Sequence, residues 1–249
     1  MTSPVPAGGF PAIEPRPDDQ IERALVVVAH PDDADFGVAG TIAGWTDAGI
    51  EVTVLCCTRG EQGARPDADI DAIPALRETE QRAASAERGV SDVRFLDGHR
   101  DGWLVPGFDL QRDILRVLRE VRPQRVVTQS PDRNWDRLQS SHPDHLAAGE
   151  AAVRACYPAS ENPFAWPELG LDPWHVGEIW VMGHPEPNHA VDITDRFDRK
   201  LAALKQHVSQ TGHRAELETF LRRGSGMMAA RMGLPEGRLA ELFRVCPLN

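Results

Sequence analysis

The fold is decided by the run Ala24-Leu-Val-Val-Val-Ala29, which is apolar throughout and mostly β-branched. Such a run is typical of a strand that is buried on both faces of a parallel sheet. The polar turn His30-Pro-Asp-Asp33 follows it directly, and small residues then recur at helix-like spacing over 35–48. The sequence therefore predicts a central first strand, a short turn and a helix that lies close against the sheet.

Strands and helices alternate along the rest of the chain. Apolar runs predict further strands over 51–57, 93–96, 125–129 and 178–182. Helical periodicity and end signals predict helices over 74–88, 110–121, 142–156 and 195–206. This alternation indicates an α/β, Rossmann-like three-layer fold with a mostly parallel sheet and helices on both faces.

Two other segments have specific predictions. Ser141 is expected to be the N-cap of the helix over 142–156, because a serine hydroxyl can accept a hydrogen bond from the first turn. The segment after His213 is expected to be helical and loop-like, with a break at Gly224-Ser-Gly226.

The length of the chain bounds its domain organisation. With 249 residues it can bury one large hydrophobic core. Residues 1–20 are proline-rich and lack periodicity, so we expect an extended or disordered N-terminal arm. Residues 21–249 are then expected to form a single domain.

Composition excludes several classes of function. The formal net charge of -11 would repel a polyanion, so nucleic acid is not an expected partner. No apolar run approaches the roughly 20 residues of a membrane helix, and the N-terminus lacks the basic start and apolar centre of a signal peptide. We therefore expect a cytoplasmic protein without a membrane span.

Two His-Pro-Asp turns carry the candidate chemistry. One is His30-Pro-Asp-Asp33 after the first strand, and the other is His142-Pro-Asp-His145 after the fourth. Because α/β sheets place their sites beyond the carboxyl ends of parallel strands, we expect these side chains to converge. A hydrolytic metal site needs two or three imidazole or carboxylate ligands, an open coordination position and a general base. His30, Asp33 and His145 would supply the ligands.

Asp32 and Asp33 should differ in role, because neighbouring side chains diverge and cannot easily bind one ion together. Asp32 is therefore the candidate general base. His142 and His145 are three residues apart on a helical turn, so one can bind metal while the other faces the substrate. His142 is assigned to the tetrahedral intermediate, either stabilising its oxyanion or protonating the leaving amine, and Asp144 would hold an imidazolium by its charge.

Each turn has a simpler interpretation when taken alone. Aspartates after a strand commonly cap the next helix. The recurrence of His-Pro-Asp at an equivalent strand-to-helix junction weakens that interpretation. A dinucleotide-dependent enzyme is a second alternative for such a fold, but two carboxylates in the first turn would repel a pyrophosphate.

Further motifs join these turns in one pattern. They are Ala29-His-Pro-Asp-Asp-Ala-Asp-Phe-Gly37, Thr58-Arg-Gly-Glu-Gln-Gly63, Arg77-x-x-Glu80, Val93-Arg-Phe-Leu96 and Ser140-Ser-His-Pro-Asp-His-Leu-Ala-Ala-Gly149. With them the chain resembles the LmbE-like, or PIG-L-type, zinc-dependent N-acetylglucosamine deacetylase family. The resemblance covers most of residues 24–210.

This resemblance implies a Zn2+ site of His30, Asp33 and His145, and the same ligand types also suit Fe2+ or another divalent ion. It implies that Asp32 is the base and that His142 is the electrostatic or acid residue. The implied substrate is a small-molecule amide, an N-acetylglucosamine conjugate that loses its acetyl group. The alternatives are an amidase that acts on thiol conjugates and a non-catalytic sugar-binding member of the fold. Relatives often form homo-oligomers, which implies the same for this chain.

Three residues beyond the two turns are candidates for substrate binding. Arg59 and Arg65 follow the second predicted strand, and Asp101 follows the third. They would border the site and bind hydroxyls or an anionic group. A solvated loop and a plain turn are equally good interpretations of these positions.

Other polar residues are expected to be structural. Arg77 is expected to pair with Glu80 or Glu78 at the surface of its helix, a contact of little energy. His184 and His189 follow a later strand and are expected at the rim of the site.

Overall fold

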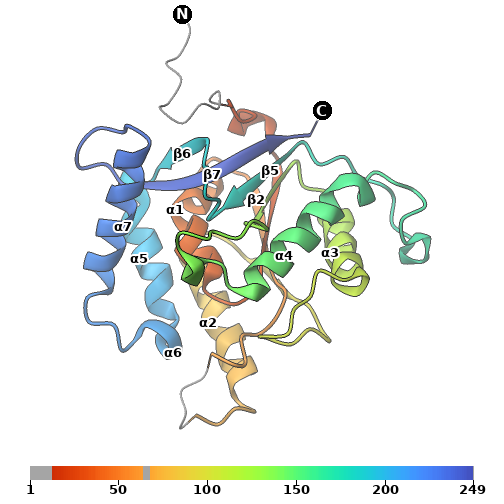
Figure 1. The fold of residues 1–249 in the computed structure, drawn as a ribbon, viewed down its shortest axis with the longest axis horizontal. Helices are drawn as coiled ribbons and strands as arrows, with labels where there is room; N and C mark the ends of the chain where they lie inside the picture. Colours follow the sequence, from red (N-terminus) through yellow and green to blue (C-terminus); the bar gives the residue numbers. More distant parts are fainter. Residues whose placement is uncertain (1–12, 64–67, 249) are drawn as a thin grey trace, which may run out of the picture.

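The computed structural model describes residues 13–63 and 68–248, which form one seven-stranded sheet covered by helices (Figure 1). The strands are β1 Arg23–Val28, β2 Glu51–Cys56, β3 Asp92–Phe95, β4 Arg125–Gln129, β5 Glu178–Met182, β6 His189–Asp192 and β7 Ala240–Pro247. The α-helices are α1 Asp33–Asp47, α2 Ile73–Glu87, α3 Phe108–Val121, α4 Pro143–Arg154, α5 Phe197–Gln206, α6 Val208–Thr211 and α7 Leu217–Arg231. No helix within the described ranges is long and apolar enough to cross a lipid bilayer.

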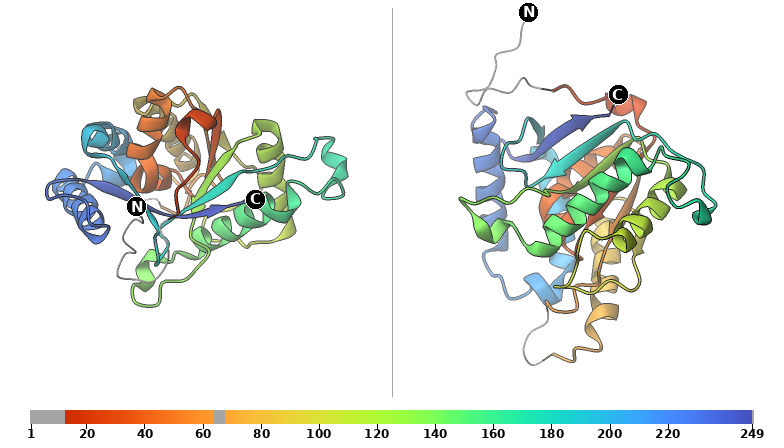
Figure 2. Two further views of the ribbon diagram at one scale, coloured as in Figure 1. Left: turned by 90° about the horizontal axis from the view of Figure 1, so that it is seen from above. Right: turned by 45° about the vertical axis from the view of Figure 1, so that its right-hand side comes forward.

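The sheet has the strand order β3-β2-β1-β4-β5-β7-β6, and β1 to β5 are parallel. Leu25 and Val27 of β1 pack with α3 and α4, whereas Val26 and Val28 pack with α1 on the other face. A strand covered on both faces is apolar at every position, which explains the unbroken run at 24–29. Figure 2 shows helices on both sides of the sheet. The predicted fold class is confirmed.

The C-terminal part differs from the prediction. Helix α7 is continuous through Gly224-Ser-Gly226, and β7 follows it, antiparallel to both β5 and β6. Glu241 of β7 is buried, and its carboxylate accepts from Lys200 Nζ at 2.6 Å and from the Thr41 N–H at 2.8 Å. This buried charge interrupts the apolar alternation that marks a strand in a sequence. The prediction of helix and loop after His213 is therefore wrong for this strand.

The described part of the predicted N-terminal arm packs against the amino ends of β4 and β5. Asp18 Oδ1 and the Arg16 carbonyl accept from the guanidinium of Arg125 at 2.7 and 2.8 Å. The Glu178 carboxylate accepts from Arg125 Nε at 2.6 Å and from the Arg16 N–H at 2.9 Å. These contacts pair the buried guanidinium and hold this part of the arm on the sheet. Residues 1–12 of the arm lie outside the described residues.

Gly149 allows α4 to approach the end of β4 closely. A Cβ atom added to it would lie 2.2 Å from the carbonyl oxygen of Gln129. That oxygen belongs to the backbone, which cannot turn aside as the end of a flexible side chain can. His145 lies one turn earlier on α4, so the close approach also sets how near this imidazole lies to the sheet.

We predict that Gly149→Ala lowers the free energy of unfolding by about 1–3 kcal/mol, the usual cost of an extra group in a close-packed contact. Urea unfolding curves would measure the change. Gly224→Ala is the matched control, because a Cβ atom there meets no atom within 4 Å. Alanine should stabilise that helix position by about 1 kcal/mol. Equal stability of the two variants would contradict the role given to Gly149.

Candidate metal centre

The two His-Pro-Asp turns lie together at the carboxyl ends of β1 and β4. His30 comes shortly after β1, and His142 and His145 lie at the start of α4. The two strand ends are joined there, because Gln129 Oε1 accepts the Ala29 N–H at 2.9 Å. The ring centroids of the three histidines are 5.1, 5.3 and 5.2 Å apart. The turns therefore converge, as the parallel topology requires.

The Asp33 carboxylate lies between two of these imidazoles. Its Oδ1 is 3.0 Å from His145 Nε2, and its Oδ2 is 3.3 Å from His30 Nδ1. Ligand atoms around a tetrahedral zinc ion, with bonds of about 2.0–2.1 Å, lie about 3.3 Å from one another. The distances from Asp33 to the two histidines are close to this separation, each through a different carboxylate oxygen. Among the described residues, two groups have ligand atoms that all lie within 4.8 Å of one another: His30, His142 and His145, and His30, Asp101 and Asp144.

The negative charge of Asp33 is stabilised despite its burial. Burial alone would raise the pKa of this carboxyl, but the charges of His145 and His30, and hydrogen bonds to them, lower the pKa well below its ordinary value. Asp33 Oδ2 also accepts the backbone N–H of His30 at 2.7 Å. The carboxylate is thus held in the ionised form that a metal ion requires of a ligand.

The far nitrogen of His30 is held by two carboxylates. Its Nε2 lies 2.9 Å from Asp101 Oδ1 and 3.1 Å from Asp144 Oδ2. Burial alone would lower the pKa of His30, but hydrogen bonds to these carboxylates and to Asp33 raise it to about 12. In metal sites, a carboxylate on the far nitrogen of a ligand histidine orients the ring, and such an arrangement at His30 would leave Nδ1 available to a metal ion.

Asp101 and Asp144 are both engaged within the protein. Asp101 Oδ2 accepts a backbone N–H from the loop after β2 at 2.8 Å, and Asp144 Oδ2 accepts the Gly102 N–H at 2.6 Å. The structure places both carboxylates on the same imidazole, that of His30. A role of Asp101 in substrate binding stays a prediction, as does a role of Asp144 in holding an imidazolium by its charge. Asp144 meets His142 through its backbone N–H.

His142, and not Ser141, caps α4. Its Nδ1 accepts the Asp144 N–H at 3.2 Å, whereas Ser141 Oγ accepts the Asn134 N–H at 2.8 Å. Because Nδ1 accepts a hydrogen bond it carries no proton, so Nε2 of His142 carries the ring N–H. Burial, and then the positive charges of the two neighbouring imidazoles, lower the pKa of His142 and favour this neutral form.

Asp32 has a left-handed backbone, with φ 82° and ψ -24°. Burial raises the pKa of its carboxyl, and the charge of Asp33 raises it further, while Arg77 lowers it. The Arg77 Nη2 lies 3.4 Å from Asp32 Oδ2. The resulting pKa is above the ordinary value of a carboxyl, which suits a general base that works near neutral pH.

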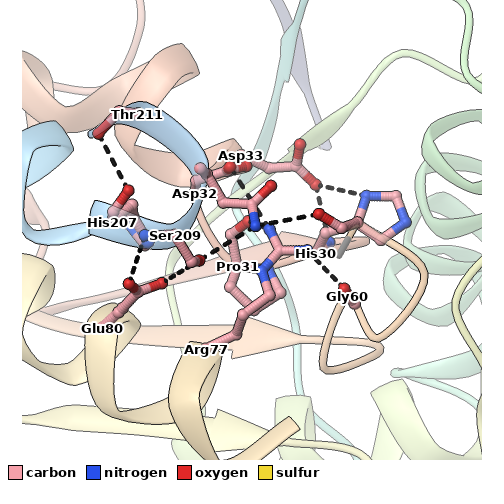
Figure 3. A network of polar contacts seen from close by, with 12 residues as sticks. His30, Pro31, Asp32, Asp33, Gly60, Arg77, Glu80, His207, Ser209 and Thr211 are labelled. Atoms are coloured by element: carbon pink, nitrogen blue, oxygen red, sulfur yellow. Dashed lines mark hydrogen bonds and ion pairs between the residues drawn. The ribbon is translucent and has the colours of Figure 1, made fainter. Parts of the chain in front are cut away.

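Arg77 is buried, so the predicted surface pair is wrong. It donates from Nη1 to the Gly60 carbonyl and from Nη2 to the Pro31 carbonyl, both at 2.7 Å (Figure 3). Glu80 instead accepts from the N–H and the hydroxyl of Ser209, at 2.7 and 2.6 Å. The two shortest contacts of Arg77 are with backbone carbonyls, which leave no trace in a sequence.

The other two candidates for substrate binding are arginines. Arg59 contacts Glu78 and donates to the Leu96 carbonyl at 2.9 Å and to Asp97 Oδ1 at 2.8 Å. Its guanidinium is therefore held between α2 and the end of β3. Arg65 lies outside the described residues. A role of either arginine in substrate binding stays a prediction.

The later histidines are not members of this cluster. His184 Nε2 is 3.0 Å from Asp132 Oδ2, and His189 packs against the ring of Trp180 with centroids 5.0 Å apart. Two of the three His-Pro dipeptides in the chain thus contribute to the cluster of imidazoles, and the dipeptide at 184–185 does not.

Comparison of the sequence with known proteins identifies its relatives. The family model described as PIG-L, GlcNAc-PI de-N-acetylase, matches residues 25–156, which include both turns. The chain is 36% identical over 191 residues to 1D-myo-inositol 2-acetamido-2-deoxy-alpha-D-glucopyranoside deacetylase of Streptomyces avermitilis. This alignment covers 66% of this chain and 62% of that protein. It is 34% identical over 201 residues to the probable N-acetyl-alpha-D-glucosaminyl L-malate deacetylase 2 of Bacillus cereus. This alignment covers 76% of this chain and 84% of that protein.

A solved structure gives the same relationship. The N,N'-diacetylchitobiose deacetylase of Pyrococcus horikoshii matches with a TM-score of 0.84 and 29% identity, over 93% of this chain and 86% of that chain. The chain spans less than two thirds of the length of the Streptomyces relative, but most of the Bacillus and Pyrococcus proteins. Because the family model covers more than half of the 249 residues, the chain belongs to the PIG-L (GlcNAc-PI de-N-acetylase) family.

Proposed function

We propose that this protein is a metal-dependent hydrolase that removes an acetyl group from the amide nitrogen of an N-acetylglucosamine-containing small molecule. The observation that carries the proposal is the position of Asp33 between His30 and His145. The names of the relatives support the substrate class, since they describe deacetylation of N-acetylglucosamine linked to inositol or malate, and of diacetylchitobiose.

The ligands of the ion would be His30 Nδ1, the Asp33 carboxylate and His145 Nε2. Two imidazoles and one carboxylate suit Zn2+ and also Fe2+. The alternative set with His142 is disfavoured, because binding through its Nε2 would move the ring proton to Nδ1 and break the cap of α4. A divalent ion supplies a Lewis acid at this position, which lowers the pKa of a water molecule and polarises the acetyl carbonyl.

The side chains of the protein would move the protons. Asp32 would take a proton from the attacking water and pass it to the leaving nitrogen. The Nε2–H of His142 would donate a hydrogen bond to the oxygen of the tetrahedral intermediate. Because the capping bond keeps His142 neutral, we assign it to the oxyanion, which decides between the two roles that the sequence leaves open.

The backbone of Asp32 disfavours a non-catalytic sugar-binding protein. A left-handed conformation costs about 1–2 kcal/mol for a residue with a side chain. Such strain persists where the surrounding structure holds it, and it clusters at active sites. An amidase that acts on thiol conjugates would use the same groups, but the names of the relatives favour a sugar conjugate.

Asp32→Asn is expected to slow amine release from N-acetylglucosamine conjugates by roughly 100-fold or more, because the general base is lost while the metal ligands remain. An amine-reactive fluorophore would measure the product, and mass spectrometry the bound metal. Turnover like that of the wild type would contradict the role of Asp32 as base. Loss of the metal from this variant would show that Asp32 is a ligand instead.

His145→Ala is expected to weaken Zn2+ binding by more than about 100-fold. Loss of a residue that only hydrogen-bonds a metal ligand weakens binding by up to about 100-fold, and loss of the ligand itself should cost more. Calorimetric titration of the metal-free protein would measure the affinity. His184→Ala, in the His-Pro dipeptide outside the cluster, is the control and should bind Zn2+ like the wild type. Removal of metal by a chelator should abolish amine release, and added Zn2+ should restore it. Equal affinity of His145→Ala and the wild type would refute the ligand set.

A further inference from the structure

The peptide group between Pro31 and Asp32 forms hydrogen bonds on both sides with side chains of α2. Its carbonyl accepts from Arg77 Nη2 at 2.7 Å, and its N–H donates to Gln81 Oε1 at 2.8 Å. Arg77 and Gln81 are four residues apart and therefore lie on the same face of α2. Two side chains of one helix thus fix the orientation of a single peptide plane. Figure 3 shows the hydrogen bond between Arg77 and the Pro31 carbonyl.

The orientation of this plane determines the backbone of Asp32. The φ angle of Asp32 is the rotation about its N–Cα bond, which relates this peptide plane to the rest of the residue, and here it is 82°. On its other side, the Asp32 carbonyl accepts the N–H groups of Asp35 and Phe36 at 2.9 Å, which begins α1. The left-handed conformation of Asp32 is therefore imposed from both ends, and the direction of its side chain follows from it.

A buried ion cluster orients the Gln81 amide. Its Nε2 donates to Asp35 Oδ2 at 2.9 Å and lies 3.3 Å from Ser85 Oγ. The Asp35 carboxylate also lies 3.0 Å from Arg88 Nε and 3.0 Å from His207 Nε2, and all three of these residues are fully buried. A carboxylate paired with a guanidinium only accepts hydrogen bonds, so the NH2 end of the amide faces it and the oxygen faces the backbone.

We infer that Gln81 is a positioning residue, which holds the peptide before Asp32 so that this carboxyl keeps the conformation in which it acts as the general base. The inference rests on the proposed function for the role of Asp32, while the chain of hydrogen bonds from Asp32 through Gln81 to Asp35 is a property of the fold. An amide is required, because it accepts from the backbone at one end and donates to Asp35 at the other. Glutamate lacks the donor, and methionine or leucine lacks both groups.

Two substitutions test this role. Gln81→Met removes both hydrogen bonds at similar volume, and Gln81→Glu places an oxygen against the Asp35 carboxylate. Each should lower kcat by about 10- to 100-fold, while KM and Zn2+ affinity stay within about 3-fold of the wild type. Gln111→Met is the matched control, because Gln111 is buried on α3 and its Nε2 donates to the Arg154 carbonyl at 3.2 Å. It should lower the unfolding temperature similarly and leave kcat unchanged.

A double substitution separates positioning from packing. Gln81→Glu combined with Asp35→Asn exchanges donor and acceptor between the two positions and restores the chain of hydrogen bonds. The double variant should recover at least about 10-fold of the kcat that Gln81→Glu loses alone, whereas independent packing effects would add. A folded double variant with the lower kcat of the two single variants would overturn the inference.

Hydrogen exchange at the Asp32 amide, followed by NMR, tests the hydrogen bond to Gln81 without a substrate. Gln81→Met should accelerate this exchange by at least about 10-fold, and Gln111→Met should not. Unchanged exchange in Gln81→Met would overturn the inference, as would an unchanged kcat. If the wild type releases no amine from any N-acetylglucosamine conjugate, the proposed function fails, and the exchange rate still decides whether Gln81 holds Asp32.

Discussion

Three carboxylates converge on the imidazole of His30, with Asp33 at its Nδ1 and Asp101 and Asp144 at its Nε2. They come from the turn after β1, the loop after β3 and the start of α4. Buried negative charges must be paired with positive charge or hydrogen-bond donors. The ring therefore joins three segments that follow different strands, and moving it would leave carboxylates without a partner. Asp33 extends the arrangement to His145, so the geometry of the whole centre depends on this ring.

Where the strands end, side chains replace neighbouring strands as the hydrogen-bond partners of the backbone. The ladder between β1 and β4 stops at the polar turns, and Gln129 then accepts the next backbone N–H, that of Ala29. Two residues further along the chain, the Pro31 carbonyl accepts from Arg77, and the following N–H, that of Asp32, donates to Gln81. The backbone groups beside the candidate metal centre are thus paired by buried side chains of neighbouring elements. A site held in this way is preorganised, because its supports are packed against the core.

The predictable half of the molecule is the parallel one, because strands covered on both faces are apolar at every position. The strand β7 is different, since it carries the buried Glu241, whose partner Lys200 lies 41 residues away. The two His-Pro-Asp turns are visible in the sequence because histidine and aspartate recur at equivalent strand-to-helix junctions. The contacts of Arg77 and Gln81 are not visible, because they involve backbone groups whose positions depend on the fold. The capping role of His142 is hidden for a related reason, since it depends on a ring nitrogen and not on the neighbouring hydroxyl.

The strand β7 lies inside the sheet, between β5 and β6, although it is the last of the described strands along the chain. In the described sheet β6 pairs with β7 alone. During synthesis β1 to β5 leave the ribosome first, and the edge of β5 stays unpaired until β7 has been made. At about 5–20 residues per second, the roughly 60 residues between β5 and β7 take several seconds to make. For that time the nascent chain exposes an unpaired edge that can capture a strand of another chain, so we expect this interval to be its most aggregation-prone stage.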